Sequence, residues 1–188
     1  ICFNPGASTS VYGNKTLLPV VARAVDCVPK YVRLTCFSLS CKQVNNLFVL
    51  SIEDVAKASA GKTIALFALP GAFTPTCSAQ HVPGYVAQFD AIKAKGVDEI
   101  WCVAVNDPFV MGAWGRDLNV GKKVRMLGDG SAEFTSKLGM EFDLTKRGLG
   151  IRSQRYAMVV ENGVVKSLSL EEPGKFEVSD AASVLKQL

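Results

Sequence analysis

The sequence has no run of about 20 consecutive apolar residues, the length that a membrane-spanning helix needs, although 48% of its residues are hydrophobic. We therefore expect a soluble protein that does not enter a membrane. Histidine is nearly absent, with His81 as the one example. No two of the six cysteines form a C-x-x-C pair. A zinc site of common spacing and a dithiol redox motif are therefore not indicated, and the irregular cysteine spacing favours free thiols in a reducing compartment.

Acidic residues are scarce at the amino-terminal end, where residues 1–50 contain five Lys or Arg and a single acid, Asp26. The basic residues are spread out without interleaved aromatic residues, so we expect no nucleic-acid binding. The basic, acid-poor balance is partly that of an organellar transit peptide, but three prolines would interrupt a long amphipathic helix. We predict that residues 1–46 are an irregular extension or a targeting remnant. The location is predicted to be the cytoplasm, a mitochondrion or a plastid.

Residues 47–188 show the periodic patterns of a single folded domain. Ser51 is predicted to cap a short helix that ends at Gly61, and Ser179 to cap the last helix. The other predicted helices cover 78–95, 108–118 and 131–138, and the predicted strands cover 62–69, 99–105, 124–127, 156–160 and 164–170. Strands and helices alternate first, and a hairpin with Asn162-Gly163 follows. This order predicts an α/β fold with a mixed central sheet flanked by helices, the arrangement of the thioredoxin fold.

The loop after the first of these strands carries the strongest chemical signal. It reads PGAFTPTC and places the thiol of Cys77 at the beginning of the following helix. Helix amino-terminal N–H groups and a nearby cation favour the thiolate form of a cysteine, which is the nucleophile toward peroxides. Thr74 lies three residues upstream and can turn its hydroxyl toward the same pocket, while Pro70 and Pro75 stiffen the loop. From the residues alone, a buried and unreactive cysteine is an equally good interpretation.

The longer segment PGAFTPTCSAQHVPGYV resembles the Pro-x-x-x-Thr-x-x-Cys active-site motif of the peroxiredoxins, and specifically their type II, or peroxiredoxin-5-like, subfamily. The segments WCVAVNDPFVMGAW and RYAMVVENGVVKSL also resemble that subfamily, in the same order. The resemblance runs from about residue 51 to the last residue. It implies a thiol peroxidase that acts on hydrogen peroxide and small alkyl hydroperoxides without metal, haem or flavin, and that forms a homodimer through its active-site edge.

The resemblance also assigns roles to individual residues. It makes Cys77 the peroxidatic nucleophile, Thr74 the hydroxyl that positions the peroxide, and Pro70 the shield against solvent. Arg155, just before a late strand, matches the essential arginine of the family, whereas Arg147 and Arg152 match less well. A guanidinium near the sulfur would favour the thiolate and stabilise charge that develops on the leaving oxygen.

His81 lies four residues after Cys77 on the same helix face, so a cysteine-histidine pair of the hydrolase type must be considered. The subfamily has a histidine at this position without a role as a base, and a peroxide needs no base once the thiolate exists. We therefore expect a structural histidine or one at the substrate rim.

The sulfenic acid formed on Cys77 must be reduced by a second thiol. Cys102 is the candidate resolving thiol, because many plant-like type II members carry their second cysteine at this place. Two alternatives stay open: Cys102 is a core thiol of a predicted strand, or glutathione, glutaredoxin or thioredoxin reduces the enzyme directly. The first hairpin of the family fold is not recognisable before residue 50, and Cys36 or Cys41 could resolve instead. Two rival functions, a redox relay and a thiol-disulfide oxidoreductase, also remain open.

Overall fold

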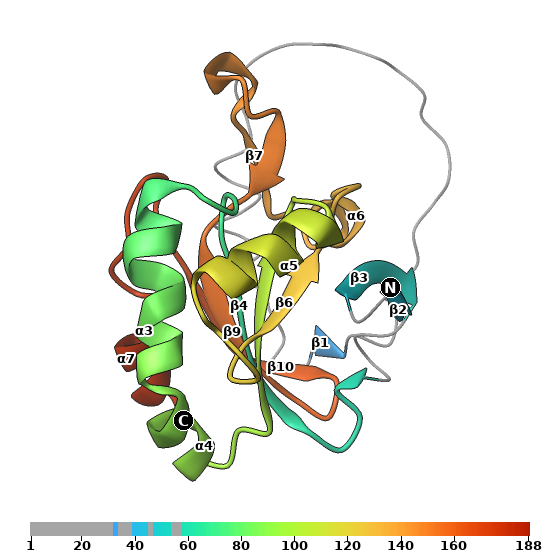
Figure 1. Ribbon diagram of the computed structural model, residues 1–188. Coiled ribbons are helices and arrows are strands. Elements are labelled where there is room, and N and C mark those ends of the chain that lie inside the picture. The colour runs from blue at the N-terminus through green and yellow to red at the C-terminus, as the bar shows by residue number, and fades with distance from the viewer. Residues whose placement is uncertain (1–31, 34–38, 45–46, 54–57) are drawn as a thin grey trace, which may run out of the picture. The chain divides into compact units, whose positions relative to one another are not determined.

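The computed structural model describes residues 32–33, 39–44, 47–53 and 58–188 (Figure 1). Within these residues the main sheet has the strand order β1-β10-β9-β4-β5-β6-β3-β2. Strands β4, β5, β6 and β3 are parallel to one another, whereas β9 is antiparallel to β4 and β10 is antiparallel to β9. The strands are β1 (Val32–Arg33), β2 (Leu39–Val44), β3 (Leu47–Glu53), β4 (Thr63–Ala68), β5 (Glu99–Ala104), β6 (Arg125–Gly128), β9 (Tyr156–Glu161) and β10 (Val164–Leu170).

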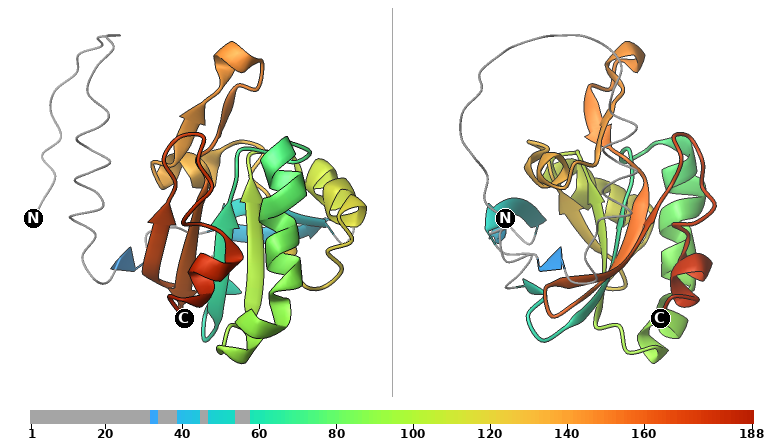
Figure 2. Two further views of the ribbon diagram at one scale, coloured as in Figure 1. Left: turned by 90° about the vertical axis from the view of Figure 1, so that its left-hand side faces the viewer. Right: turned by 180° about the vertical axis from the view of Figure 1, so that it is seen from behind.

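Helices cover both faces of this sheet. Alternate side chains of β4 point to opposite faces, so Phe67 packs with one apolar cluster and Leu66 with another, and both are buried. The first cluster includes side chains from α3, α4, α5 and α7, and the second includes α6; α3 and α7 lie side by side in both views of Figure 2. The helices are η2 (Cys77–His81), α3 (Val82–Ala87), α4 (Phe89–Ala94), α5 (Pro108–Asp117), α6 (Glu133–Lys137), η3 (Thr145–Arg147) and α7 (Ala181–Leu185). None of the helices in the described part of the chain has the length and apolar character needed to cross a bilayer.

Most of the predicted elements of residues 58–188 are present, and the α/β architecture with a mixed sheet is confirmed. The hairpin turn forms as predicted, because Asn162 and Gly163 both adopt positive φ angles, +49° and +75°. The helix predicted at 78–95 is divided. It begins as the π-helical turn η2 and is interrupted at Gln88, between α3 and α4.

Two predicted helix caps are wrong. Ser51 lies inside β3, whose apolar run of residues 47–50 was not recognised as a strand. The last helix is capped by Asp180, whose carboxylate accepts hydrogen bonds from the backbone N–H groups of Ala182 and Ser183. Ser179 is instead a buried residue of the preceding loop.

Two pairs of strands were not predicted. Strands β2 and β3 pair antiparallel at one edge of the sheet, in the region where the sequence showed no recognisable hairpin. The boundary predicted between residues 46 and 47 falls between these two strands, and the nature of residues 1–46 stays a prediction. The second pair, β7 (Glu141–Asp143) and β8 (Ile151–Ser153), forms a small sheet that projects beyond the main sheet, in orange at the top of Figure 1.

Candidate active site

The sheet topology brings Cys77 and Arg155 to the same edge. Cys77 follows the carboxyl end of β4 after a short loop, and Arg155 immediately precedes β9. Because β9 is antiparallel to β4, its first residue, Tyr156, pairs with the last residue of β4, Ala68. Two residues that are 78 positions apart in the sequence therefore meet where β4 ends.

The loop between β4 and η2 is fixed by hydrogen bonds to its own backbone and to the loop that follows β5. The hydroxyl of Thr74 donates to the carbonyl of Gly71 at 2.8 Å, and the N–H of Ser78 donates to the carbonyl of Thr74 at 2.9 Å. The N–H of Ala72 donates to the side-chain oxygen of Asn106 at 2.9 Å. The hydroxyl hydrogen of Thr74 is thus donated within the loop. The lone pairs of the hydroxyl oxygen remain able to accept a hydrogen bond from a ligand.

Cys77 is completely buried and lies in the first turn of the helix, since Thr76 already has helical backbone angles. Its sulfur is 3.5 Å from both terminal nitrogens of Arg155, and both nitrogens donate to it. A guanidinium is permanently charged and presents its donors in a rigid fork, so it can direct two N–H groups at the same sulfur. Cys77 and Cys102 are both free thiols.

The ring of His81 faces the guanidinium of Arg155. Its Nδ1 atom lies 2.9 Å from Nη1 of Arg155, and its Nε2 atom lies 3.1 Å from the carbonyl oxygen of Ser179. The ring is completely buried, between Phe67 and Phe176. Burial, followed by the charge of Arg155, lowers the pKa of His81 from 6.5 to about 3. His81 is therefore neutral at physiological pH, and the expectation of a substrate-rim position is wrong because no part of the ring is exposed.

The loop that leads into α7 is organised by a buried carboxylate. Oε1 of Glu171 accepts four hydrogen bonds of 2.8 Å, from the backbone N–H groups of Glu177, Val178 and Ser179 and from the Ser179 hydroxyl. These bonds keep the pKa of Glu171 below its usual value despite the opposing effect of burial. The backbone N–H of Glu171 also donates to the carbonyl of Arg155 at 3.0 Å. The loop is thereby tied to the residue that contacts Cys77.

The structure brings some of the predicted site residues together and separates others. Cys77 and Arg155 are in contact, Thr74 lies in the loop between β4 and η2, and Pro70 begins that loop and is half-buried. Cys102 lies inside β5, completely buried, in the same apolar cluster as Cys77. Burial, and then the neighbouring Cys77, raise the pKa of the Cys102 thiol well above its usual value.

The remaining predicted residues lie in other elements of the fold or outside the described residues. Arg147 is exposed in η3, and Cys36 lies outside the described residues. Cys41 lies in β2, where it pairs with Leu50. Arg152 belongs to β8 and donates to the side chain of Asn106 at 3.3 Å, so it contacts the loop rather than the thiol.

Three residues of the site were missed at the sequence level, and Arg152 was considered only as a weaker match for the essential arginine. Asn106 and Arg152 support the 70–74 loop, and a β-carbon on Gly71 would lie 2.8 Å from Nη1 of Arg152, so a larger residue there would displace the end of that side chain. Glu171 and Ser179 were also missed. Asn106 was detectable in principle, because it is a polar residue shortly after a buried strand, but no local pattern marks the roles of Glu171 and Ser179.

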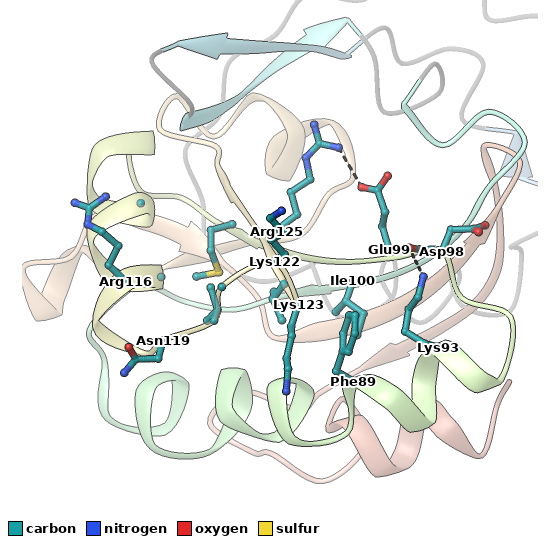
Figure 3. Close-up of a pocket in the computed structure, with 16 residues that line it drawn as sticks. Phe89, Lys93, Asp98, Glu99, Ile100, Arg116, Asn119, Lys122, Lys123 and Arg125 are labelled. Atoms are coloured by element: carbon teal, nitrogen blue, oxygen red, sulfur yellow. Dashed lines mark hydrogen bonds and ion pairs between the residues drawn. The ribbon is translucent and has the colours of Figure 1, made fainter.

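A hollow lies at the opposite end of the sheet from Cys77, where β5 begins (Figure 3). Five cationic side chains and two acids line it: Lys93, Arg116, Lys122, Lys123, Arg125, Asp98 and Glu99. Glu99 is paired with Arg125 and with Lys62. No cysteine lines this hollow, so we do not assign the thiol chemistry to it.

Comparisons with known proteins place the chain among the peroxiredoxins. The family model described as Redoxin matches residues 52–185. The chain is 48% identical to peroxiredoxin-2D of Arabidopsis thaliana, over 77% of this chain and 87% of that protein. It is 53% identical to the chloroplastic peroxiredoxin-2E of the same plant over 71% of this chain, and there it spans only 58% of the relative's length. The crystal structure of reduced Prx3 from Vibrio vulnificus matches with a TM-score of 0.75 and 47% identity, covering 85% of this chain and 97% of that one. The structure of that protein in complex with hydrogen peroxide matches with a TM-score of 0.73 and 48% identity, covering 80% of this chain and 92% of that one.

Proposed function

Because the chain belongs to the Redoxin family and is a peroxiredoxin, an oxidoreductase with a thioredoxin-like fold, we propose that it reduces hydrogen peroxide and alkyl hydroperoxides through Cys77. The observation that carries the proposal is the contact of both terminal nitrogens of Arg155 with the Cys77 sulfur, each at 3.5 Å. A fixed positive charge at this distance favours the thiolate. It also lies where negative charge would develop on a peroxide oxygen.

In the proposed reaction the thiolate attacks the terminal oxygen of the peroxide. A sulfur–oxygen bond forms and the oxygen–oxygen bond breaks; the sulfur is oxidised by two electrons and the peroxide is reduced. The leaving oxygen takes a proton and departs as water or as an alcohol. The product on the enzyme is the sulfenic acid of Cys77.

Thr74 and Pro70 are proposed to shape the pocket for this step. Since the Thr74 hydroxyl donates to Gly71, its oxygen is free to accept a hydrogen bond from the protonated oxygen of the peroxide. Pro70 carries no backbone N–H group, so at the start of the loop it adds no competing donor and limits the access of water.

Regeneration requires a thiol, and Cys102 is the candidate within the described residues. Its thiol would condense with the sulfenic acid, form a disulfide with Cys77 and release water. Both cysteines are completely buried, and Cys102 is held in β5, so a disulfide requires that η2 unwinds and carries Cys77 toward it. Glutaredoxin with glutathione, or thioredoxin, would then supply the reducing electrons.

We also propose a homodimer that forms through the active-site edge. Phe73 of the 70–74 loop and Phe109 of α5 are 56% and 62% exposed, and Phe73 adopts a left-handed φ angle of +59° that presents its ring on the surface. Exposed aromatic side chains of this size favour association with another protein surface. A cytoplasmic or organellar location is compatible with the chloroplastic relatives.

Stopped-flow oxidation of the fully reduced protein by hydrogen peroxide tests the peroxidase proposal, with tryptophan fluorescence as the signal. Trp114 donates to the side chain of Ser78, the residue after Cys77, so its emission should respond to oxidation. We expect a fast phase that is lost in Cys77→Ser and kept in Cys102→Ser. A wild-type protein that reacts no faster than free cysteine would refute the peroxidase activity.

A further inference from the structure

His81 takes no part in the chemistry proposed above, yet it is fixed on both sides of its ring. We propose that His81 is a positioning residue that holds the guanidinium of Arg155 against the Cys77 sulfur. We propose further that Glu171 fixes His81 through the carbonyl of Ser179. The proposal rests on the proposed roles of Cys77 and Arg155.

The hydrogen-bond partners determine the state of the histidine ring. A guanidinium can only donate, so Nδ1 of His81 must accept from Nη1 of Arg155, at 2.9 Å. The carbonyl of Ser179 can only accept, so Nε2 must carry the hydrogen and donate to it, at 3.1 Å. Only a neutral ring with its hydrogen on Nε2 satisfies both contacts. The position of Ser179 therefore selects the tautomer that can receive Arg155.

The carbonyl of Ser179 is itself held in place. The carboxylate of Glu171 accepts from both the backbone N–H and the hydroxyl of Ser179, each at 2.8 Å. The same carbonyl also accepts from the hydroxyl of Tyr85 at 2.9 Å, and the Tyr85 ring stacks on Phe67 with 3.9 Å between centroids. A continuous chain of contacts thus runs from a buried carboxylate to the reactive sulfur.

Arg155 needs such support because its side chain is long and has several rotatable bonds. Nη1 of Arg155 contacts both the Cys77 sulfur and Nδ1 of His81, which is a neutral acceptor. The Phe176 ring lies 5.5 Å from the guanidinium carbon of Arg155. These contacts restrict the fork to the orientation in which both terminal nitrogens reach Cys77. Without the acceptor, the guanidinium would sample orientations that lose one or both contacts with the sulfur.

A double-mutant cycle with His81→Phe and Arg155→Met tests the proposal. Phenylalanine keeps an aromatic ring between Phe67 and Phe176 but offers no acceptor to Arg155. We expect His81→Phe to lower the second-order rate constant for hydrogen peroxide roughly tenfold in the wild-type background and to have no further effect beside Arg155→Met. An unchanged rate, or an equal loss in both backgrounds, would overturn the proposal.

Two further pairs of variants separate positioning from folding. In His81→Asn the amide oxygen can take the place of Nδ1 and should preserve most of the rate, whereas His81→Gln places its amide nitrogen near Nε2 and should lose it. Glu171→Gln keeps an accepting oxygen and should preserve the rate better than Glu171→Ala. Equal rates within each pair would contradict the proposal, even where the melting temperatures differ. A slow wild-type protein would instead refute the proposed function of Cys77, so the two failures are distinguishable.

Discussion

Replacing Arg155 by methionine should remove most of the reactivity of Cys77 toward hydrogen peroxide. The guanidinium is 3.5 Å from the sulfur, where two unit charges interact by roughly 5 kcal/mol at an effective dielectric constant of 20. Arg155 is half-buried, so solvent reduces this value. Loss of one donor to a developing oxyanion costs about 10²- to 10³-fold in rate. We therefore expect Arg155→Met to lower the second-order rate constant by about 10³-fold, and Arg155→Lys by less because it keeps the charge but not the fork.

The assay is stopped-flow fluorescence at pH 7 with hydrogen peroxide in excess. Arg147→Met is the matched control, because Arg147 is an exposed arginine of η3 that was a weaker match for the same role. It should leave the rate unchanged. If Arg155→Met reacts within a factor of three of the wild type, the contact between the guanidinium and the sulfur does not support the reaction, and the reasoning from the geometry fails.

Three further predictions follow from the same contacts. Thr74→Val should lower the rate constant for hydrogen peroxide about 10- to 100-fold while Thr74→Ser restores most of it, because only the hydroxyl oxygen can accept from the peroxide. In Cys102→Ser, titration of free thiols after one equivalent of peroxide should show one thiol lost per chain instead of two, with the first oxidation step unchanged; equal losses would exclude Cys102 as the resolving thiol. The folded chain should lose stability as the pH falls from 6.5 toward 3, by at most about 1.4 kcal/mol per pH unit from His81. In that window the unfolded chain binds a proton on His81 and the folded chain does not; urea midpoints at pH 7 and pH 5 should therefore differ more in the wild type than in His81→Asn.

The sequence was most informative where local patterns determine structure. The buried strands β4 and β5 are continuous apolar runs, and Asp107 and Pro108 mark the beginning of α5 with a cap that accepts two backbone hydrogen bonds of 2.9 Å. The position of Cys77 at the start of a helix follows from the same kind of pattern. Strand β3 was not predicted because Ser51, with Asp54 three residues later, matches the pattern of a capping box and so indicated a helix. Pairing of β3 with β2 and β6 outweighs that local preference.

Contacts between distant segments could not be predicted in the same way. Arg155 was placed beside Cys77 through the family resemblance, but its geometry depends on the antiparallel register of β9 with β4. The participation of Glu171 and Ser179 depends on the path of the loop before α7, which no local propensity specifies. The three backbone N–H groups that donate to the Glu171 carboxylate come together only when this loop has folded, so the sequence alone does not show the interaction.

The proposed catalytic cycle places opposite demands on the segment that carries Cys77. Attack on the peroxide needs the folded state, in which the sulfur is buried and contacts Arg155, because the charge is most effective where water is excluded. Disulfide exchange with a reductant needs an accessible sulfur. Residues 77–81 form a π-helical turn, in which the N–H of Val82 donates to the carbonyl of Cys77, and such turns are less favourable than α-helix. Oxidation removes the negative charge of the thiolate and with it much of the attraction of Arg155. We therefore expect hydrogen exchange of the amides of residues 77–82 to become faster in the sulfenic acid form of Cys102→Ser than in its reduced form. Equal exchange in the two forms would mean that the reductant must reach Cys77 in the folded helix.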